Sequence, residues 1–446
     1  MMRKYSMSDT KNNQAVGEWP DPRYSWFVVF ILTLALILAF ADRFILSLLV
    51  EPIKDEFSLS DTEIGLLQGL PFGVFYTFFA IPLGRLADNW NRKKLLLCCI
   101  FIWSIMTAVC GLARSYAFLF MARIGVATGE AGLGPITMTL ISDYFPKEKR
   151  TKPFGVFLSG THIGGGLALI IGGAIVEMVA SGEGVTLPFF GPLKAWQMAF
   201  ILVGLPGLLI LPLVAIIKEP KRQGGDEKFK IGEVLQFIRK HWRAYSAIFL
   251  GMSCMGTVAS SINAWGPAMF MRIYGWDFEQ IGFGFGGAIL LGGVGGSLMA
   301  GSVEGYFFNR GYQDAKIRSI ALCGFLMAPV SFAGIVSGDP LLAFCGITVT
   351  VFLFAIPLVL GPAAIMAITP GRLRGQAGAI YIVFIGLLGG FVGPMFVPLL
   401  TDFVFQDDAM MPYSLAIVVG VIGPLGGLIL YTGRKFFVEA DRLSEG

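Results

Sequence analysis

The stretch Leu119–Pro135, LFMARIGVATGEAGLGP, places two charged side chains inside an otherwise apolar run. Arg123 and Glu130 are seven positions apart, which on a helix is two turns and about 10 Å of rise, so they share one face. Charged side chains are rare at membrane depth, where they face a bundle interior or a water-filled cavity. Gly125 and Gly129 would let a neighbouring helix approach closely. The stretch therefore predicts a membrane helix with a polar face suited to a solute or proton path.

The composition of the whole chain indicates a membrane protein. Its 446 residues are 55% hydrophobic and only 14% charged, and the mean hydropathy is +0.71. Soluble globular proteins carry roughly 25% charged residues. Several windows near 20 residues long have almost no charge, which is the length a helix needs to cross the hydrocarbon. We therefore expect a multi-pass membrane protein.

Apolar segments of this length recur along the chain and predict twelve membrane helices. They lie at 24–50, 61–87, 93–113, 116–145, 153–180, 195–218, 241–275, 279–304, 314–337, 340–369, 373–405 and 411–437. Most of the 34 Lys and Arg fall in the N-terminal tail, in alternate loops, in the central linker and near the C-terminus. Because cytoplasmic loops are enriched in Lys and Arg, both termini are expected in the cytoplasm. The short termini favour a bacterial inner (plasma) membrane.

The spans divide into two groups of six of nearly equal length. The expected organisation is a cytoplasmic tail, a first half, a linker, a second half and a cytoplasmic tail, at 1–23, 24–218, 219–240, 241–437 and 438–446. Within the linker, Ile231, Val234, Leu235 and Ile238 have the spacing of an apolar helix face. This predicts a short amphipathic helix on the cytoplasmic membrane surface; a solvated connector is the alternative.

A polar motif lies between the second and third spans, at Gly84-Arg-Leu-Ala-Asp88-Asn-Trp-Asn-Arg92-Lys-Lys94. It resembles the loop 2–3 signature of the major facilitator superfamily, although Trp90 and Asn91 depart from it. In that family the cluster latches the cytoplasmic gate, so the resemblance implies this role for Gly84, Asp88 and Arg92. A basic loop that only sets topology is the other interpretation.

The major facilitator superfamily has two six-helix halves facing each other across a central cavity. The expected fold class is therefore an all-α membrane protein of twelve transmembrane helices in two pseudo-symmetric halves. Glycines concentrate in the fifth span, from Gly160 to Gly173, and at corresponding positions of the eleventh, from Gly386 to Gly393. This matching pattern supports an internal repeat, and small residues at these spacings pack helices closely.

Asp42 and Arg43 add two adjacent charges within the first span. Each costs roughly 2.5–3.5 kcal/mol at the bilayer centre on insertion scales, which favours a functional role. Adjacent residues on a helix point about 100° apart, so the two are not expected to pair with each other alone. An ion pair near the outer leaflet is the alternative interpretation.

A closer resemblance, strongest over about 40–145, is to the spinster family. It rests on Asp42-Arg43, Pro52-Ile-Lys54, Glu56-Phe57, the segment from Asp61 to Gln68, and Arg123-Ile-Gly-Val-Ala-Thr-Gly-Glu-Ala131. Spinster-like proteins resemble proton-coupled exporters of amphipathic lipids such as lysophospholipids or sphingoid phosphates. The resemblance implies that Asp42 and Glu130 carry the proton and that Arg43 and Arg123 are charge partners or contacts for a substrate anion.

These residues suggest a coupling hypothesis. Protonation of Glu130 or Asp42 would release its arginine, and this exchange would bias inward-open against outward-open states. Anion symporters of the same superfamily also carry Asp-Arg in the first span, so a proton-linked organic-anion or multidrug transporter is the alternative function.

Other polar residues within spans are weaker candidates. His162 would serve as a proton relay or simply as a packing residue. The possible cavity-lining residues are His162, Asn263, Trp265, Arg272 and Tyr381.

Several function classes lack support in the sequence. Only two histidines are present, and neither HExxH nor GxSxG occurs, so an enzyme is not expected. The sequence contains no GxxxxGK[ST] loop, the motif that would indicate ATP-driven transport. We expect no cofactor, no metal and no nucleic-acid partner. The expected partners are a small amphipathic or anionic substrate, protons and the lipid bilayer, with a monomeric protein.

Overall fold

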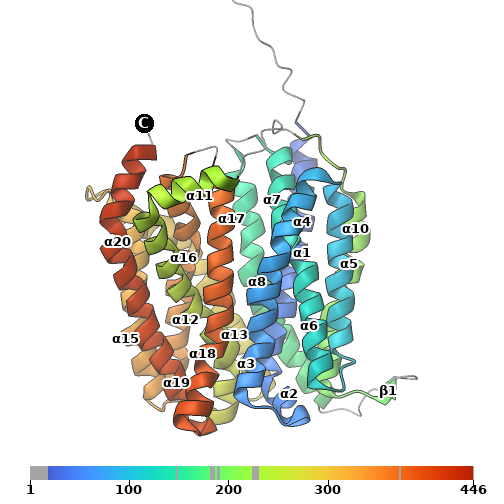
Figure 1. Ribbon diagram of the computed structural model, residues 1–446. Coiled ribbons are helices and arrows are strands. Elements are labelled where there is room, and N and C mark those ends of the chain that lie inside the picture. The colour runs from blue at the N-terminus through green and yellow to red at the C-terminus, as the bar shows by residue number, and fades with distance from the viewer. Residues whose placement is uncertain are drawn as a thin grey trace, which may run out of the picture.

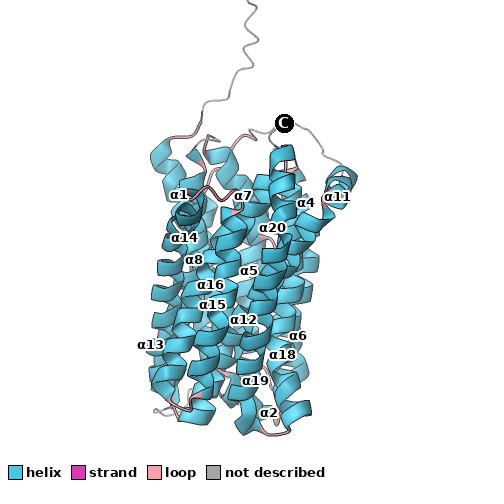
Figure 2. Ribbon diagram, turned by 90° about the vertical axis from the view of Figure 1, so that its left-hand side faces the viewer, coloured by secondary structure: helices cyan, strands magenta, loops and turns pink. Residues whose placement is uncertain are grey.

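The computed structural model describes residues 19–146, 149–180, 186–187, 191–222, 231–370 and 373–444. Twelve described helical segments are long and apolar enough to cross a membrane, which confirms the predicted count. Their bounds are Pro22–Leu48, Asp61–Asn89, Arg92–Cys110, Tyr116–Tyr144, Thr151–Met178, Ala195–Ile216, Trp242–Tyr274, Phe278–Phe308, Ala315–Val336, Pro340–Ile368, Arg374–Phe405 and Asp408–Arg442. The fold class is therefore the predicted all-α membrane bundle, with helices along its long axis (Figure 2).

Several spans are built from more than one helical segment. The first half contains α1(Pro22–Leu48), α2(Val50–Phe57), α3(Asp61–Leu70), η1(Pro71–Tyr76), α4(Thr77–Asn89), α5(Arg92–Cys110), α6(Tyr116–Glu130), α7(Leu133–Tyr144), α8(Thr151–Ala180), α9(Ala195–Leu209) and α10(Leu211–Ile216). A two-stranded antiparallel hairpin, β1(Thr186–Leu187) and β2(Gly191–Pro192), connects α8 to α9. The hairpin lies at the end of the bundle opposite the termini (Figure 1).

The second half follows the linker helix α11(Ile231–Lys240). It contains α12(Trp242–Tyr274), α13(Phe278–Gly287), η3(Ala288–Gly292), α14(Gly293–Phe308), α15(Ala315–Val336), α16(Pro340–Ile368), α17(Arg374–Phe384), η4(Ile385–Phe391), α18(Val392–Leu399), η5(Leu400–Phe405), η6(Asp408–Met410), α19(Met411–Ile417), η7(Val418–Ile422) and α20(Gly423–Ser444). Helix α20 thus extends well into the predicted tail 438–446. Residues 1–18 of the predicted N-terminal tail and 223–230 of the linker lie outside the described residues.

Polar residues at the helix ends explain where several spans begin. Asp21 caps α1, with Pro22 at its first position, and Asn91 caps α5 by accepting from the amide of Lys94. Ser60 and Glu63 form a capping box at α3. Such caps satisfy amide groups that a helix start leaves without intrahelical partners. The caps therefore stabilise the first turns of α1, α3 and α5 and explain where these helices begin.

The two six-helix halves stand side by side, with the linker helix α11 lying across one end of the bundle (Figure 1). We call this end, where α1 begins and α20 ends, the terminal face, and the other end the opposite face. In α11 the side chain of Val234 is buried while Leu235 is 52% exposed. Of the predicted apolar face of this helix, Val234 therefore packs against the protein, while Leu235 lies on the surface.

Contact between the halves runs from the opposite face to about the middle of the bundle. Helix α8 packs on α13, and α3 packs on α18. A Cβ atom on Gly166 would lie 2.8 Å from the carbonyl oxygen of Gly286, and one on Gly65 would lie 2.8 Å from that of Pro394. These backbones therefore approach as closely as small residues allow. Nearer the terminal face, α4 packs on α7 and α17 packs on α16, each within its own half.

Candidate functional site

The four charged residues predicted from the sequence lie together inside the first half. Asp42 and Arg43 come from α1, and Arg123 and Glu130 come from α6. Asp42, Arg123 and Glu130 are each 1% exposed. The Arg43 Nε donates a 2.7 Å hydrogen bond to Glu130 Oε2, and the Arg43 side chain is 24% exposed. The helix packing thus pairs Glu130 with Arg43 from another helix.

Asp42 is held by a different set of contacts. The Thr107 hydroxyl on α5 donates to Asp42 Oδ2 at 2.9 Å. The Arg123 guanidinium donates to the backbone carbonyl oxygen of Asp42 at 3.1 Å. Three helices therefore position the two carboxylates, and buried polar groups need such partners to offset the loss of hydration. Thr107 was not singled out in the sequence, because a lone Thr in an apolar span is common.

Aromatic rings surround the two guanidinium groups. Arg43 lies 4.6 Å from the ring centre of Phe72 and 4.5 Å from that of Tyr76, and Arg123 lies 4.8 Å from Phe72. These distances are typical of cation–π contacts, which strengthen when the cation is desolvated. Both rings come from η1, a π-helical segment of the second span, and such segments are frequent at functional sites. One turn of spacing between the two rings was the available sequence signal.

Three buried atoms of this cluster have no hydrogen-bond partner among the described residues. They are Asp42 Oδ1, Glu130 Oε1 and Arg123 Nε. An unsatisfied buried polar atom costs about 1–3 kcal/mol, so natural proteins seldom keep several together without a role. Each carboxylate has one oxygen with a partner and one without, which leaves an oxygen that can accept a proton.

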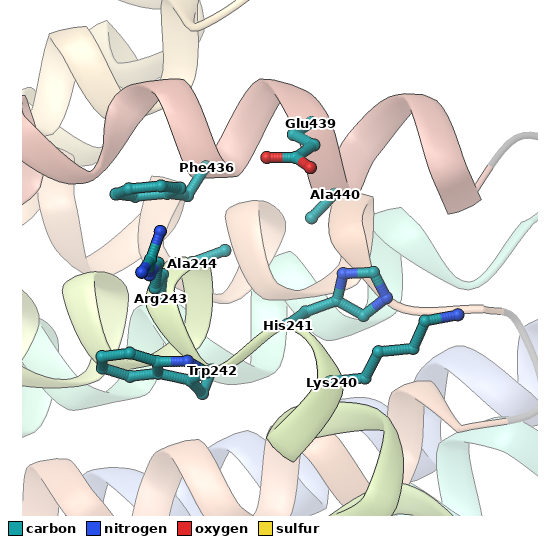
Figure 3. Close-up of a pocket in the computed structure, with 8 residues that line it drawn as sticks. All are labelled: Lys240, His241, Trp242, Arg243, Ala244, Phe436, Glu439 and Ala440. Carbon is teal, nitrogen blue, oxygen red and sulfur yellow. The ribbon is translucent and has the colours of Figure 1, made fainter.

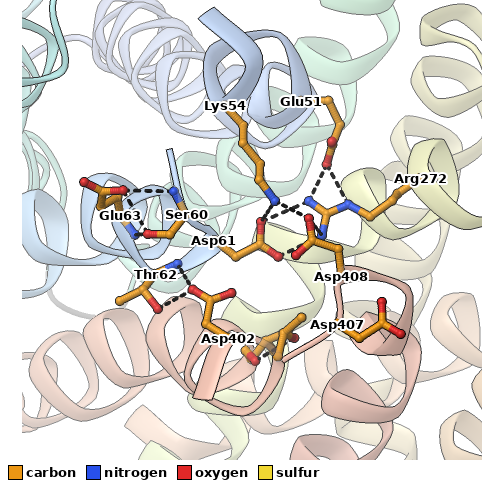
Figure 4. Close-up of polar contacts among 12 residues, drawn as sticks. Glu51, Lys54, Ser60, Asp61, Thr62, Glu63, Arg272, Asp402, Asp407 and Asp408 are labelled. Atoms are coloured by element: carbon orange, nitrogen blue, oxygen red, sulfur yellow. Dashed lines mark hydrogen bonds and ion pairs between the residues drawn. The ribbon is translucent and has the colours of Figure 1, made fainter. Parts of the chain in front are cut away.

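A second charged network joins the two halves at the opposite face (Figure 4). Arg272 at the end of α12 donates to Glu51 at 2.7 Å and to Asp61 at 2.8 Å. Lys54 contacts Asp61 at 2.8 Å and Asp408 at 2.6 Å. Arg272 and Asp408 belong to the second half and the others to the first, so the contacts span the seam. Arg272, a possible cavity-lining residue from its position in the sequence, belongs to this network.

A further pair lies beside this network. The backbone amide and the hydroxyl of Thr62 both donate to Asp402 Oδ2, at 2.8 and 2.6 Å. The amide belongs to the first turn of α3, where a carboxylate interacts favourably with the helix dipole. Asp402 therefore holds the start of α3 from the other half. We call Glu51, Lys54, Asp61, Thr62, Arg272, Asp402 and Asp408 the opposite-face network.

The loop 2–3 motif makes its described contacts within the first half and the start of the linker. Arg92 is 1% exposed, pairs with Asp143, and donates to Glu219 at 2.7 Å. Gly84 faces Pro135 of α7. Asp88 has an exposed side chain, and its backbone carbonyl accepts from Arg222. The motif thus fastens α4 and α5 to the linker, and its role as a latch of the cytoplasmic gate stays a prediction.

The weaker candidates fall in two places. His162 lies against Gly293, at the seam between the halves. Trp265 is fully buried and donates to the carbonyl oxygen of Pro394 at 2.8 Å. Tyr381 is 4% exposed and packs by Phe249. Trp265 and Tyr381 are both buried within the second half, and their cavity-lining role stays a prediction. Asn263 is half-buried on α12.

Comparison with known proteins agrees with this architecture. The family model described as Major Facilitator Superfamily matches residues 32–394. The "MFS-type efflux pump" of Mycolicibacterium smegmatis is 26% identical over 92% of this chain and 92% of its own length. "Protein spinster homolog 1" of Xenopus tropicalis is 27% identical over 94% of this chain and 82% of its own length.

The fold is also similar to that of solved structures. A bacterial homologue of the human lysosomal transporter spinster, in an inward-facing and unoccupied conformation, superposes with a TM-score of 0.75 at 23% identity. That comparison covers 95% of this chain and 98% of the other. This chain belongs to the Major Facilitator Superfamily of membrane transporters and is similar to the spinster proteins within it.

Proposed function

We propose that this protein is a proton-coupled secondary transporter that exports an amphipathic, lipid-like substrate by alternating access. The observation that carries the proposal is the buried cluster of Asp42, Arg43, Arg123 and Glu130 in the first half. Ionisable residues inside a membrane bundle are expensive and mark ion or substrate pathways. A stabilising role alone would not require two carboxylates that each keep an oxygen without a partner.

The Arg43–Glu130 pair supports the proposal of proton coupling. The ionised Glu130 holds Arg43 by a charge-assisted hydrogen bond. Protonation removes the negative charge and weakens this hold, so Arg43 becomes free to contact a substrate anion. Arg43 has the most exposed side chain of the four charged residues, which suits a change of partner from Glu130 to a substrate anion. Asp42 is the second candidate carrier, because its carboxylate also has an oxygen without a partner.

Alternating access is supported by the distribution of contacts between the halves. The opposite-face network and the close glycine contacts hold the halves together at one end. The helices nearer the terminal face pack within their own halves. This arrangement is that of an inward-open transporter, if the terminal face is cytoplasmic as the Lys and Arg distribution predicts. Breaking the opposite-face network would then accompany the change to the outward-open state.

The substrate class is inferred from similarity together with the site. Relatives named spinster match most of the chain, and the spinster resemblance implies lysophospholipids or sphingoid phosphates. Arg43 beside the rings of Phe72 and Tyr76 offers a cation for a phosphate and apolar surface for an adjoining chain. The protein is proposed to act as a monomer in the inner membrane of a bacterium, with both termini in the cytoplasm.

A proton-linked organic-anion or multidrug transporter is the second candidate. One specific finding favours it, since a relative of similar length is named an efflux pump. The same charged cluster would then serve a smaller anion or a drug.

The experiment that tests the substrate class is transport by the purified protein in proteoliposomes with an imposed pH gradient. The panel contains a lysophospholipid, a sphingoid phosphate, a small sugar acid and a cationic dye. We expect gradient-dependent movement of the two lipids. Movement of the sugar acid or the dye without the lipids would replace the proposal with the second candidate.

A further inference from the structure

A pocket of about 270 Å³ lies at the terminal face and shares no lining residue with the charged cluster. One wall is the junction of α11 and α12, and the other is the last part of α20 (Figure 3). Two of its lining residues, Ala244 on α12 and Ala440 on α20, are buried. The remaining lining residues are Lys240, His241, Trp242, Arg243, Phe436 and Glu439.

The charges of this pocket favour a phosphate group. Lys240 and Arg243 supply two permanent cations from adjacent turns of the chain. Burial and the neighbouring Lys240 lower the pKa of His241 below its ordinary value, so its imidazole is neutral at neutral pH. Glu439 on α20 faces these groups across the pocket (Figure 3). The lining therefore carries a net positive charge with one carboxylate.

Packing of aromatic rings holds the guanidinium in place. Arg243 lies 5.1 Å from the ring centre of Phe436 and 5.6 Å from that of Trp242. These contacts restrict the Arg243 side chain, so less entropy is lost when it binds an anion. A guanidinium presents several donors in a planar fork that suits phosphate oxygens.

The surroundings of the pocket identify the source of the phosphate. Trp242 at the start of α12 is 58% exposed, and Leu235 on the linker helix is 52% exposed. Tryptophan is enriched where the hydrocarbon meets the headgroups, and amphipathic helices such as α11 lie in that plane. A phosphate bound by Arg243 would therefore have the exposed ring of Trp242 next to it for acyl chains.

We propose that this pocket binds the phosphodiester of a membrane phospholipid from the leaflet at the terminal face. Arg243 contacts the phosphate, Lys240 on the other side of His241 adds to the positive charge of the site, and Trp242 contacts the acyl chains (Figure 3). Glu439 is placed to pair with a headgroup ammonium, as phosphatidylethanolamine would supply. The bound lipid joins the linker helix to α20. The inference is independent of the proposed transport reaction, because no residue of the charged cluster takes part.

The test is native mass spectrometry of the purified full-length protein, with phosphatidylethanolamine, phosphatidylglycerol and the water-soluble glycerol phosphate added in separate titrations. The variant Lys240→Gln/Arg243→Gln removes both cations. Its matched control, Arg23→Gln/Lys152→Gln, removes one exposed Arg and one exposed Lys of the first half. We expect one tightly retained phospholipid, a roughly tenfold loss of affinity in the variant, and no change in the control. The thermal unfolding temperature of each variant verifies that it is folded.

Two results would overturn the proposal. Equal lipid retention by the wild type, the variant and the control would show that the pocket is not the binding site. Binding of glycerol phosphate at least as tightly as the phospholipids would identify a site for free phosphate. The variant Glu439→Gln separates headgroups: a selective loss of phosphatidylethanolamine supports the proposed ammonium contact, and equal retention of both lipids refutes that contact.

Discussion

Arg43 on α1 and Glu130 on α6 form a 2.7 Å ion pair inside the first half. The pair differs from an ion pair on a protein surface, because Glu130 is buried and Arg43 lies among aromatic rings. A buried charge left without its partner is costly. Protonation of the carboxylate would therefore weaken this pair, which connects α1 to α6 within the first half.

Replacing Arg43 with lysine should lower the transport rate by about tenfold although the charge remains, because a lysine lacks the planar guanidinium that contacts the Phe72 and Tyr76 rings. The measurement is the initial rate of substrate efflux from proteoliposomes. Arg85→Lys, at an exposed position, is the matched control. Equal rates for Arg43→Lys and the wild type would show that the positive charge alone is sufficient.

The variant Arg272→Gln should open the opposite face. The substitution removes hydrogen bonds to Glu51 and Asp61 and the positive charge that pairs with these two carboxylates. The outward-open population should therefore rise by about tenfold. Spin labels at the exposed positions Asp55 and Glu279, in a cysteine-free background, report the distance across the seam.

Lys194→Gln is the control for that experiment, since Lys194 pairs with Glu56 of the same half. Its distance distribution should match that of the unsubstituted protein. A distribution for Arg272→Gln that also matches would mean that the opposite-face network does not hold the halves together.

Alanine at Gly166 should reduce transport. Its Cβ atom would lie 2.8 Å from the backbone oxygen of Gly286, so α8 and α13 would have to separate. Gly155→Ala in the same helix has no atom within 4 Å of the new Cβ and serves as the control. The control should be neutral or slightly stabilising, since Ala favours a helix by up to about 1 kcal/mol over Gly. Equal transport rates of the two variants would contradict the close approach.

Arg92→Gln should destabilise the protein by about 3–5 kcal/mol, because Asp143 and Glu219 would lose the buried cation between them. Thermal unfolding in detergent, followed by loss of monodisperse protein, measures the effect. Arg85→Gln, in the exposed part of the same motif, should leave the unfolding temperature unchanged. A similar fall in the unfolding temperature of both variants would indicate that the total positive charge of the motif, and not the pairing of Arg92, stabilises the protein.

The spans and the fold could be predicted because hydrophobic length and charge distribution are properties of the chain alone. All twelve predicted spans lie within a few residues of the observed ones. The candidate site could be predicted in part, since charged residues in apolar spans are conspicuous. The partner of Glu130 was not predictable from spacing: Arg123 shares its helix face, yet α1 brings Arg43 to it.

The remaining features depend on how helices pack. Arg272 and Asp408 are far apart in sequence, and only the approach of the two halves makes them part of one network. Trp265 is polar enough to suggest a cavity, but its indole N–H is taken by the carbonyl of Pro394. Phe72 and Tyr76 resemble any other aromatic residues of a span. Periodicity identifies a helix face, and tertiary contact decides what that face meets.

The most direct test of the account is substrate-driven pH change in proteoliposomes containing the wild type, Glu130→Gln or Glu177→Gln. Glu177→Gln removes a carboxylate of α8 outside the charged cluster and is the matched control. We predict that the wild type and Glu177→Gln move protons with substrate, while Glu130→Gln binds substrate without moving protons. Proton movement by Glu130→Gln equal to that of the wild type would contradict the claim that this carboxylate couples protons to transport.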